Sequence, residues 1–166
     1  MTAEKIVQKD ELIAILEPRV RAGKRVVFTN GCFDLLHVGH VRYLASARAC
    51  GDLLVVGLNS DRSVRTIKGP TRPLVPQDQR AEVLAALACV DFVVIFEEPD
   101  PGALIEAILP QVLVKGADWP EDRIIGARAV RGAGGTVVRV PVVPGAATST
   151  IIERILQLSK EPATDD

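Results

Sequence analysis

Two histidines three residues apart are the side chains of this sequence whose type and spacing best suit chemistry. His37 and His40 lie in the run 31–40 (GCFDLLHVGH), directly after an apolar stretch, and the chain has no other histidine. On the first turn of a helix both rings can lie on one side, and Gly39 between them leaves room for a substrate. The N–H groups that begin a helix lack partners within it and attract anions. The run therefore predicts a phosphate site at a strand–helix junction.

Such a pair of imidazoles can assist transfer of a phosphorus-centred group without a covalent intermediate. During in-line attack, negative charge collects on the non-bridging oxygens, and fixed donors aimed at them lower the barrier. We expect the two rings to form a two-pronged cationic clamp. The alternative is a pair of helix histidines without a chemical role. A zinc site is not expected, because Cys32, Cys50 and Cys89 have no ligand spacing and no further histidine is available.

Composition limits the class of protein. With 166 residues, 48% of them hydrophobic and 25% charged, the chain suits one soluble globular domain. The 20 Lys and Arg residues nearly balance the 21 Asp and Glu, and the net charge of −1 provides no field for nucleic acid. The sequence has no membrane-length apolar stretch and no charged leader, and its cysteines are odd in number. We expect a cytoplasmic protein with buried, reduced thiols that binds neither membrane nor nucleic acid.

Short Val-rich runs alternate with segments of helical periodicity along the chain. Strands separated by helices of this length indicate right-handed βαβ units. We therefore expect an α/β fold, a doubly wound, Rossmann-like, mostly parallel five-stranded sheet with helices on both faces. Ligands of such sheets bind beyond the carboxyl ends of the strands, and the histidine run follows the first strand. The predicted strands are 25–30, 52–59, 91–96, 112–115 and 136–140, and the predicted helices are 10–21, 38–50, 77–88, 101–109 and 148–158.

Three segments are expected along the chain. Residues 1–23 form an N-terminal helical segment, 24–159 the main domain and 160–166 a polar tail. Within the first segment Asp10 suits an N-cap, and Pro18 is expected to kink or end the helix. The helix over 77–88 is expected to place Val83, Leu84 and Leu87 on one face, and the stretch before it is expected to be a loop.

The run 31–40 resembles the GxFDxxHxGH signature of the cytidylyltransferase-like nucleotidyltransferases, which transfer a nucleoside monophosphate from a nucleoside triphosphate. The resemblance covers residues 24–155 and implies the fold of that superfamily. One branch, D-glycero-β-D-manno-heptose 1-phosphate adenylyltransferase, is the most similar, and often occurs fused to a sugar kinase. This chain resembles the free-standing form, which implies a separate heptose kinase upstream. The segments that carry the likeness to the branch are 29–34, 56–61, 68–73, 79–80 and 114–118.

The resemblance implies roles around the α-phosphorus of ATP. His37 and His40 are expected to stabilise its pentacovalent transition state. Lys68 begins a loop restrained by two prolines, and we expect it to contact the acceptor or the α-phosphate. Arg72 or Arg80 is expected to hold the sugar phosphate or the triphosphate, the alternative being an exposed surface charge. The backbone expected to line the triphosphate belongs to Gly31, Cys32 and Phe33.

Polar residues at the ends of the predicted strands extend the expected site. Asn59 and Asp61 follow the second strand and are expected to contact the nucleotide, or else to cap the next helix. Asp34 is expected to bind Mg²⁺ through water, to orient a histidine or to cap a helix. Trp119 either flanks the adenine or packs as an anchor. The resemblance places the base and ribose near Lys115, Gly116 and Asp118, and adds Asn30 to the nucleotide site.

Residues 145–150 (GAATST) resemble the GxSTT turn, whose hydroxyls and helix-start amides hold the β- and γ-phosphates in the superfamily. Ala147 stands where serine is usual, so that one hydroxyl is missing. Thr148, Ser149 and Thr150 remain as candidates, and the backbone donors do not depend on side chains. The alternative is an ordinary helix N-cap.

Together these features predict a direct displacement, in which AMP passes from Mg²⁺-bound ATP to a heptose 1-phosphate and pyrophosphate leaves. Glycerol-3-phosphate cytidylyltransferase and FMN adenylyltransferase activities keep the same chemistry and stay open as alternatives. A catalytically silent nucleotide sensor is the alternative from another class. A homodimer is also left open, because the superfamily often forms dimers.

Overall fold

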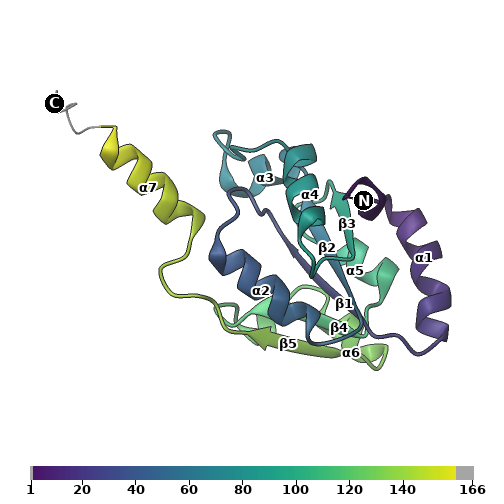
Figure 1. Cartoon of the computed structure of the whole chain (residues 1–166). Coiled ribbons are helices and arrows are strands. Elements are labelled where there is room, and N and C mark those ends of the chain that lie inside the picture. Colours follow the sequence, from purple (N-terminus) through teal and green to yellow (C-terminus); the bar gives the residue numbers. More distant parts are fainter. Residues whose placement is uncertain (1, 160–166) are drawn as a thin grey trace.

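The computed structural model describes residues 2–159, and its centre is one five-stranded sheet. The strand order is β3-β2-β1-β4-β5, and every pair of neighbours is parallel (Figure 1). This confirms the predicted doubly wound α/β fold. The strands are β1 Val26–Gly31, β2 Leu53–Asn59, β3 Phe92–Phe96, β4 Val112–Gly116 and β5 Thr136–Val140.

Helices cover both faces of the sheet, because successive side chains of a strand point to opposite faces. In β1, Val27 packs in one apolar cluster with Leu44, whereas Val26 and Phe28 pack in the other with Leu12. The first cluster draws on α2 Val38–Arg48 and α4 Gln77–Ala86, and the second on α1 Lys9–Arg21, α5 Gly102–Ile108 and α6 Ala127–Gly132. The N-terminal segment therefore packs on the same sheet as the rest of the core.

The direction of winding reverses between β1 and β4, which are neighbours in the sheet. From β1 the chain proceeds through β2 to β3, and then returns to the other side through β4 and β5. The loops that follow β1 and β4 leave the sheet in opposite directions, and a crevice opens between them. The predicted histidine run follows β1 and therefore lies at this point.

Several predicted helix boundaries are wrong. Gln8, not Asp10, is the N-cap residue of α1, and this helix continues through Pro18 to Arg21. Pro18 removes only one helix hydrogen bond near the end of α1, while buried Leu12 and Leu16 hold the helix on the sheet.

The buried face of α4 also differs from the predicted one. Val83 is 49% exposed, and Leu87 lies just after the helix, which ends at Ala86 instead of at residue 88. Leu84 is buried as expected, together with Arg80 and Ala81. Arg80 is thus a charged residue on the buried face of α4, which the spacing of apolar residues does not predict.

A helix fills part of the stretch that was expected to be a loop. Ser60 is the N-cap of α3 Asp61–Lys68, and its hydroxyl accepts a hydrogen bond from the Ser63 amide. Apolar periodicity gave no signal here, because Val64 is the only apolar residue of α3 that is buried. Two further elements, η2 Glu121–Arg123 and the short helix α6, were not predicted, whereas η1 Thr2–Lys5 lies within the expected N-terminal helical segment.

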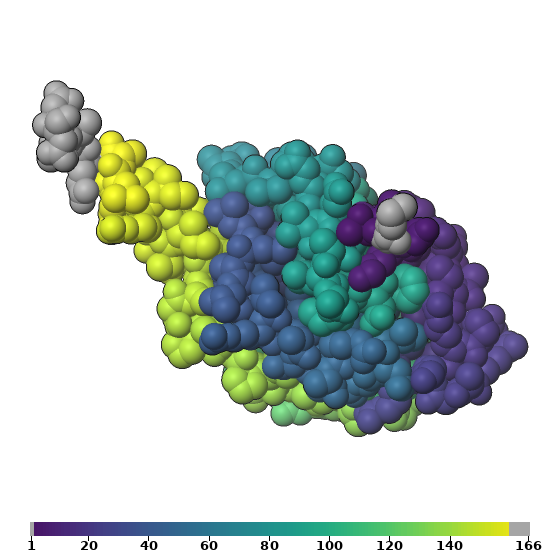
Figure 2. All heavy atoms as spheres, in the orientation of Figure 1, coloured from purple at the N-terminus to yellow at the C-terminus, as the bar shows by residue number. Residues whose placement is uncertain are grey.

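The last described helix, α7 Thr148–Leu158, extends away from the sheet (Figure 1), and Figure 2 shows it in yellow beside the body of the molecule. The predicted bounds of α7 are confirmed, and the predicted tail over 160–166 lies outside the described residues. No helix within 2–159 is long and apolar enough to cross a membrane. Cys32, Cys50 and Cys89 are free thiols, and they are half-buried where buried thiols were expected.

Candidate active site

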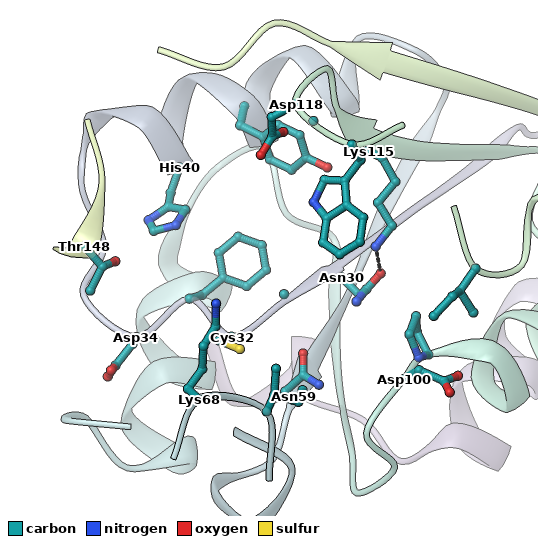
Figure 3. Close-up of a pocket in the computed structure, with 18 of the residues that line it drawn as sticks. Asn30, Cys32, Asp34, His40, Asn59, Lys68, Asp100, Lys115, Asp118 and Thr148 are labelled. Atoms are coloured by element: carbon teal, nitrogen blue, oxygen red, sulfur yellow. Dashed lines mark hydrogen bonds between the residues drawn. The ribbon is translucent and has the colours of Figure 1, made fainter. Parts of the chain in front are cut away.

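A pocket of about 600 Å³ opens at the carboxyl ends of β1, β2 and β4 (Figure 3). Its volume is in the range of small-molecule sites. Most residues expected from the sequence line it, namely Asn30, Gly31, Cys32, Phe33, Asp34, His40, Asn59, Lys68, Arg72, Lys115, Gly116, Asp118, Thr148 and Ser149. His37, Gly39, Asp61, Arg80 and Thr150 are not among the lining residues.

The two histidines lie on one side at the start of α2, as their spacing predicts, and their rings stack. Their ring centroids are 3.9 Å apart, and His40 also meets the edge of Phe33 at 5.3 Å. His37 is the N-cap residue of α2, and its Nδ1 accepts a hydrogen bond of 3.1 Å from the Gly39 amide. An accepting Nδ1 carries no proton, so that Nε2 of the neutral ring is the donor. The backbone of the helix start thus sets the tautomer of His37.

Burial makes this pair neutral in the free protein. It lowers the pKa of His40 to about 4, with a smaller contribution from His37, and it lowers the pKa of His37 as well. Nδ1 of His40 is buried and has no hydrogen-bond partner among the described residues. The expected cationic clamp is therefore, before a ligand binds, a pair of neutral imidazoles. A bound polyanion would favour their protonated forms.

We expect the His40 ring to stay neutral down to about pH 4 in the free protein and to take up a proton at higher pH when ATP is bound. Because the folded-state pKa lies below the ordinary 6.5, the unfolded chain takes up the proton first, and this group lowers stability as pH falls from 6.5 towards 4. NMR titration of the imidazole nitrogens, with and without ATP, checks this. An unliganded pKa of 6.5 or above would contradict the burial argument.

Gly39 lets the two rings sit close to the helix start. A Cβ at this position would lie 2.9 Å from the His37 ring and 3.1 Å from the Ala146 Cβ. We expect Gly39→Ala to displace His37 and to lower kcat about 10²-fold, as displacement of about 1 Å does in other sites. Pyrophosphate release measures kcat. The matched control is Gly132→Ala, where a Cβ meets nothing within 4 Å; equal losses in both variants would contradict the prediction.

Asp34 holds the loop that follows α3. Its carboxylate accepts hydrogen bonds from Arg72 Nε at 2.6 Å, from the Leu74 amide at 2.8 Å and from the Val75 amide at 2.9 Å. Burial raises the pKa of Asp34, but these hydrogen bonds outweigh it and hold the pKa below its ordinary value. Asp34 caps no helix, because His37 has that position in α2.

The residues present do not form a protein-built magnesium site around Asp34. Both of its oxygens are engaged, and within residues 2–159 no group of three or more His, Cys, Asp or Glu side chains is placed to hold a metal. Mg²⁺ often binds chiefly to substrate phosphates. The magnesium role of Asp34 stays a prediction that this donor set does not favour.

Arg80 is a structural residue, and neither role expected for it fits the structure. Its side chain is 0% exposed, so it is not a surface charge. The guanidinium donates to the backbone oxygens of Val75, Cys32 and Asn59 and forms an ion pair with Asp61 at 2.7 Å. Four of its five N–H groups are engaged, and the side chain is buried and does not line the pocket, so Arg80 is not placed to hold a phosphate there. It joins the turn after β1, the end of β2 and the loop before α4.

Lys115 and Trp119 form another wall of the pocket. Lys115 donates to Asn30 Oδ1, which links the ends of β4 and β1, and burial lowers its pKa to about 8. Its Nζ lies 5.8 Å from the centroid of the Trp119 ring, which is 49% exposed. Trp119 is therefore no buried packing anchor. A Cβ on Gly116 would lie 2.3 Å from Asp118 Oδ1, so a larger residue here would displace the Asp118 carboxylate.

The start of α7 brings its hydroxyls to the pocket. Thr148 and Ser149 line it, and Thr148 Oγ1 donates to the Leu35 backbone oxygen at 3.3 Å. Ala147 is the N-cap residue and offers no side-chain hydrogen bond. The structure thus brings this turn beside the histidine run, although more than 100 residues separate the two in the sequence.

Tyr43 is a pocket residue that the sequence analysis missed. Its hydroxyl lies 2.7 Å from Thr29 Oγ1 and donates to the Val114 backbone oxygen at 3.2 Å, and burial raises its pKa to about 12. The spacing of three residues from His40 on the same helix was a usable signal. Arg123 and Val142 also line the pocket, without a signal in the sequence that distinguishes them.

The family model described as cytidylyltransferase-like matches residues 28–154, which include every wall of this pocket. The chain belongs to the cytidylyltransferase-like family. Within it, the chain is 58% identical over 151 residues to the bifunctional protein HldE of Geotalea uraniireducens, and 54% identical over 153 residues to HldE of Geobacter sulfurreducens. These matches cover 91% and 92% of this chain but only 31% of each relative.

Solved structures agree with this fold. The lipopolysaccharide core biosynthesis protein of Thermoplasma volcanium is 28% identical with a TM-score of 0.60, over 73% of this chain and 98% of that one. The pantoate-beta-alanine ligase of Francisella tularensis, in a complex with beta-gamma ATP and beta-alanine, has a TM-score of 0.64 at 16% identity, over 97% of this chain and 80% of that one. At 16% identity, the second likeness shows that the two chains share a fold and no more.

Proposed function

We propose that this chain transfers AMP from ATP to D-glycero-β-D-manno-heptose 1-phosphate and releases pyrophosphate, giving ADP-heptose. The observation that carries the proposal is the 54–58% identity to HldE proteins, which runs through all the segments around the pocket. The heptose branch is also the one that the segments 56–61 and 68–73 resemble. His40, on which His37 stacks, lines one cavity together with Lys68 and the start of α7, as transfer between two phosphate esters requires.

In the proposed reaction an oxygen of the sugar 1-phosphate attacks the α-phosphorus of ATP. The new P–O bond forms as the bond to the pyrophosphate oxygen breaks, and pyrophosphate leaves with that electron pair. The acceptor oxygen is already ionised at neutral pH, so no general base is required. His37 Nε2–H and the His40 ring stabilise the non-bridging oxygens, and Lys68 offsets the charge of the converging phosphates.

Other parts of the pocket are proposed to bind and orient ATP. The Trp119 ring and Asp118 are proposed to contact the base and ribose of ATP. The β- and γ-phosphates are proposed to bind to Thr148, Ser149 and the backbone at the start of α7. Magnesium is proposed to arrive on the phosphates of ATP. The sugar 1-phosphate is proposed to come from a heptose kinase activity, and the chain is proposed to act on small molecules in the cytoplasm as a homodimer.

Pyrophosphate release tests the proposal, with ATP or CTP offered against heptose 1-phosphate, glycerol 3-phosphate and FMN. We expect turnover only with ATP and the heptose phosphate. Turnover with another pair would retain the chemistry and overturn the substrate. If calorimetry shows that ATP binds but no acceptor gives turnover, the result favours the nucleotide sensor.

A further inference from the structure

We propose that Asp34 is a positioning residue for Lys68: it fixes the loop 69–75 beside the pocket and thereby holds the Lys68 ammonium where the phosphates react. The inference rests on the proposed function only for the statement that phosphates react there. It replaces the metal role that the sequence suggested for Asp34 with a role in the placement of a catalytic cation.

The first observation is the set of contacts that Asp34 makes. Its side chain is 1% exposed, and its oxygens receive the Arg72 guanidinium and the amides of Leu74 and Val75. Three donors from one short loop thus converge on one buried carboxylate. Hydrogen bonds to a charged group are among the strongest in proteins, and a buried carboxylate needs them all.

The second observation is how little else holds this loop. Leu74 is 51% exposed, and the space around Gly69, which has a φ of +99°, is open. Among the described residues, every side-chain hydrogen bond between 69–75 and the rest of the molecule involves Asp34 or Arg80. Arg80 reaches the loop only at its end, through the Val75 oxygen. The middle of the loop therefore depends on Asp34.

The third observation is the direction of the side chains. Figure 3 shows Lys68 reaching into the pocket towards the side of His40, whereas the Asp34 carboxylate points away from that space. Lys68 is the last residue of α3 and directly precedes the loop. Its side chain is exposed and flexible and has no hydrogen-bond or ion-pair partner within residues 2–159, so the backbone at 68–69 sets where its ammonium can lie. Fixing that backbone lowers the entropy lost when Lys68 meets a phosphate.

A double-mutant cycle tests this directly. Asparagine in place of Asp34 keeps the shape, but it removes the charge and one acceptor oxygen. We expect Asp34→Asn to lower kcat/KM about 10- to 100-fold and Lys68→Met about 10²-fold or more, while the double variant is no worse than Lys68→Met within about threefold. The control Asp78→Asn, an exposed carboxylate on α4, leaves kcat/KM unchanged. Losses that multiply in the double variant would overturn the proposal.

Two further readouts separate positioning from other roles. Trypsin cleaves after Lys68, and we expect Asp34→Asn to be cut there at least 10-fold faster than the wild type, with the same dependence of activity on Mg²⁺ concentration. An unchanged rate of cleavage with a shifted Mg²⁺ dependence would make Asp34 a metal ligand and overturn the proposal. If the wild type turns over none of the acceptors, the proposed function fails, whereas the cleavage rate still decides whether Asp34 holds the loop.

Discussion

Replacement of His40 by alanine is expected to lower kcat about 10²- to 10³-fold, the loss found when one donor to a transition-state oxygen is removed. His40 lines the pocket and stacks on His37, so its ring is the imidazole most directly exposed to a substrate there. The ring is neutral before ATP binds, and its contribution grows as charge develops at phosphorus. Single-turnover measurement of AMP transfer isolates this step from product release.

The variant should still bind ATP. A change of less than about 10-fold in the Kd for ATP beside a 10²-fold loss of kcat would place the interaction in the transition state. The control is Arg128→Met, which replaces an exposed residue on α6 and shows any loss that comes from preparing a variant. A His40→Ala protein with normal kcat and weakened ATP binding would show that the ring only binds the ground state.

Replacement of Arg80 by methionine is expected to lower the free energy of unfolding by about 3–5 kcal/mol, as breaking a buried ion pair does. Methionine fills a similar volume, so the loss comes from the acceptors left behind. The backbone oxygens of Cys32, Asn59 and Val75 would lose their buried donor, and Asp61 its partner. Urea unfolding followed by circular dichroism measures this loss.

Arg128→Met again provides the comparison, because that side chain is exposed and a surface arginine contributes within about 0.5 kcal/mol. If Arg80→Met unfolded at the same urea concentration as the control, Arg80 would be free to act elsewhere, and the phosphate role expected from the sequence would return. If Arg80→Met does not fold, Arg80→Lys, which keeps the charge but can reach fewer acceptors, should show a smaller loss in the same assay.

Arg72 and Arg80 show why residue type alone assigns roles poorly. Arg72 and Arg80 are both close to the proline-containing loop in sequence, and one or the other was expected to bind phosphate. The structure places Arg72 at the pocket with its Nε on Asp34, whereas Arg80 is buried and does not line the pocket. Charge is readable from a sequence, whereas the side of a helix that faces the core depends on packing.

The sequence by itself determined the features that arise between near neighbours in the chain. The stacking of His37 and His40 follows from their spacing at a helix start, and the parallel sheet from the alternation of Val-rich strands with helices. The location of the site followed as well, because the run 31–40 comes directly after the first strand. These features depend on backbone periodicity and local hydrogen bonds, both of which the order of residues expresses.

Only the tertiary structure decided which polar groups serve the substrate and which serve the fold. Asp34 meets a loop about 40 residues further along the chain, and Arg80 joins three segments that the sequence keeps apart. Burial of His40 lowers its pKa to about 4, which the ordinary titration of imidazole does not suggest. The physical reason is that desolvation and buried hydrogen bonds depend on groups that only folding brings together.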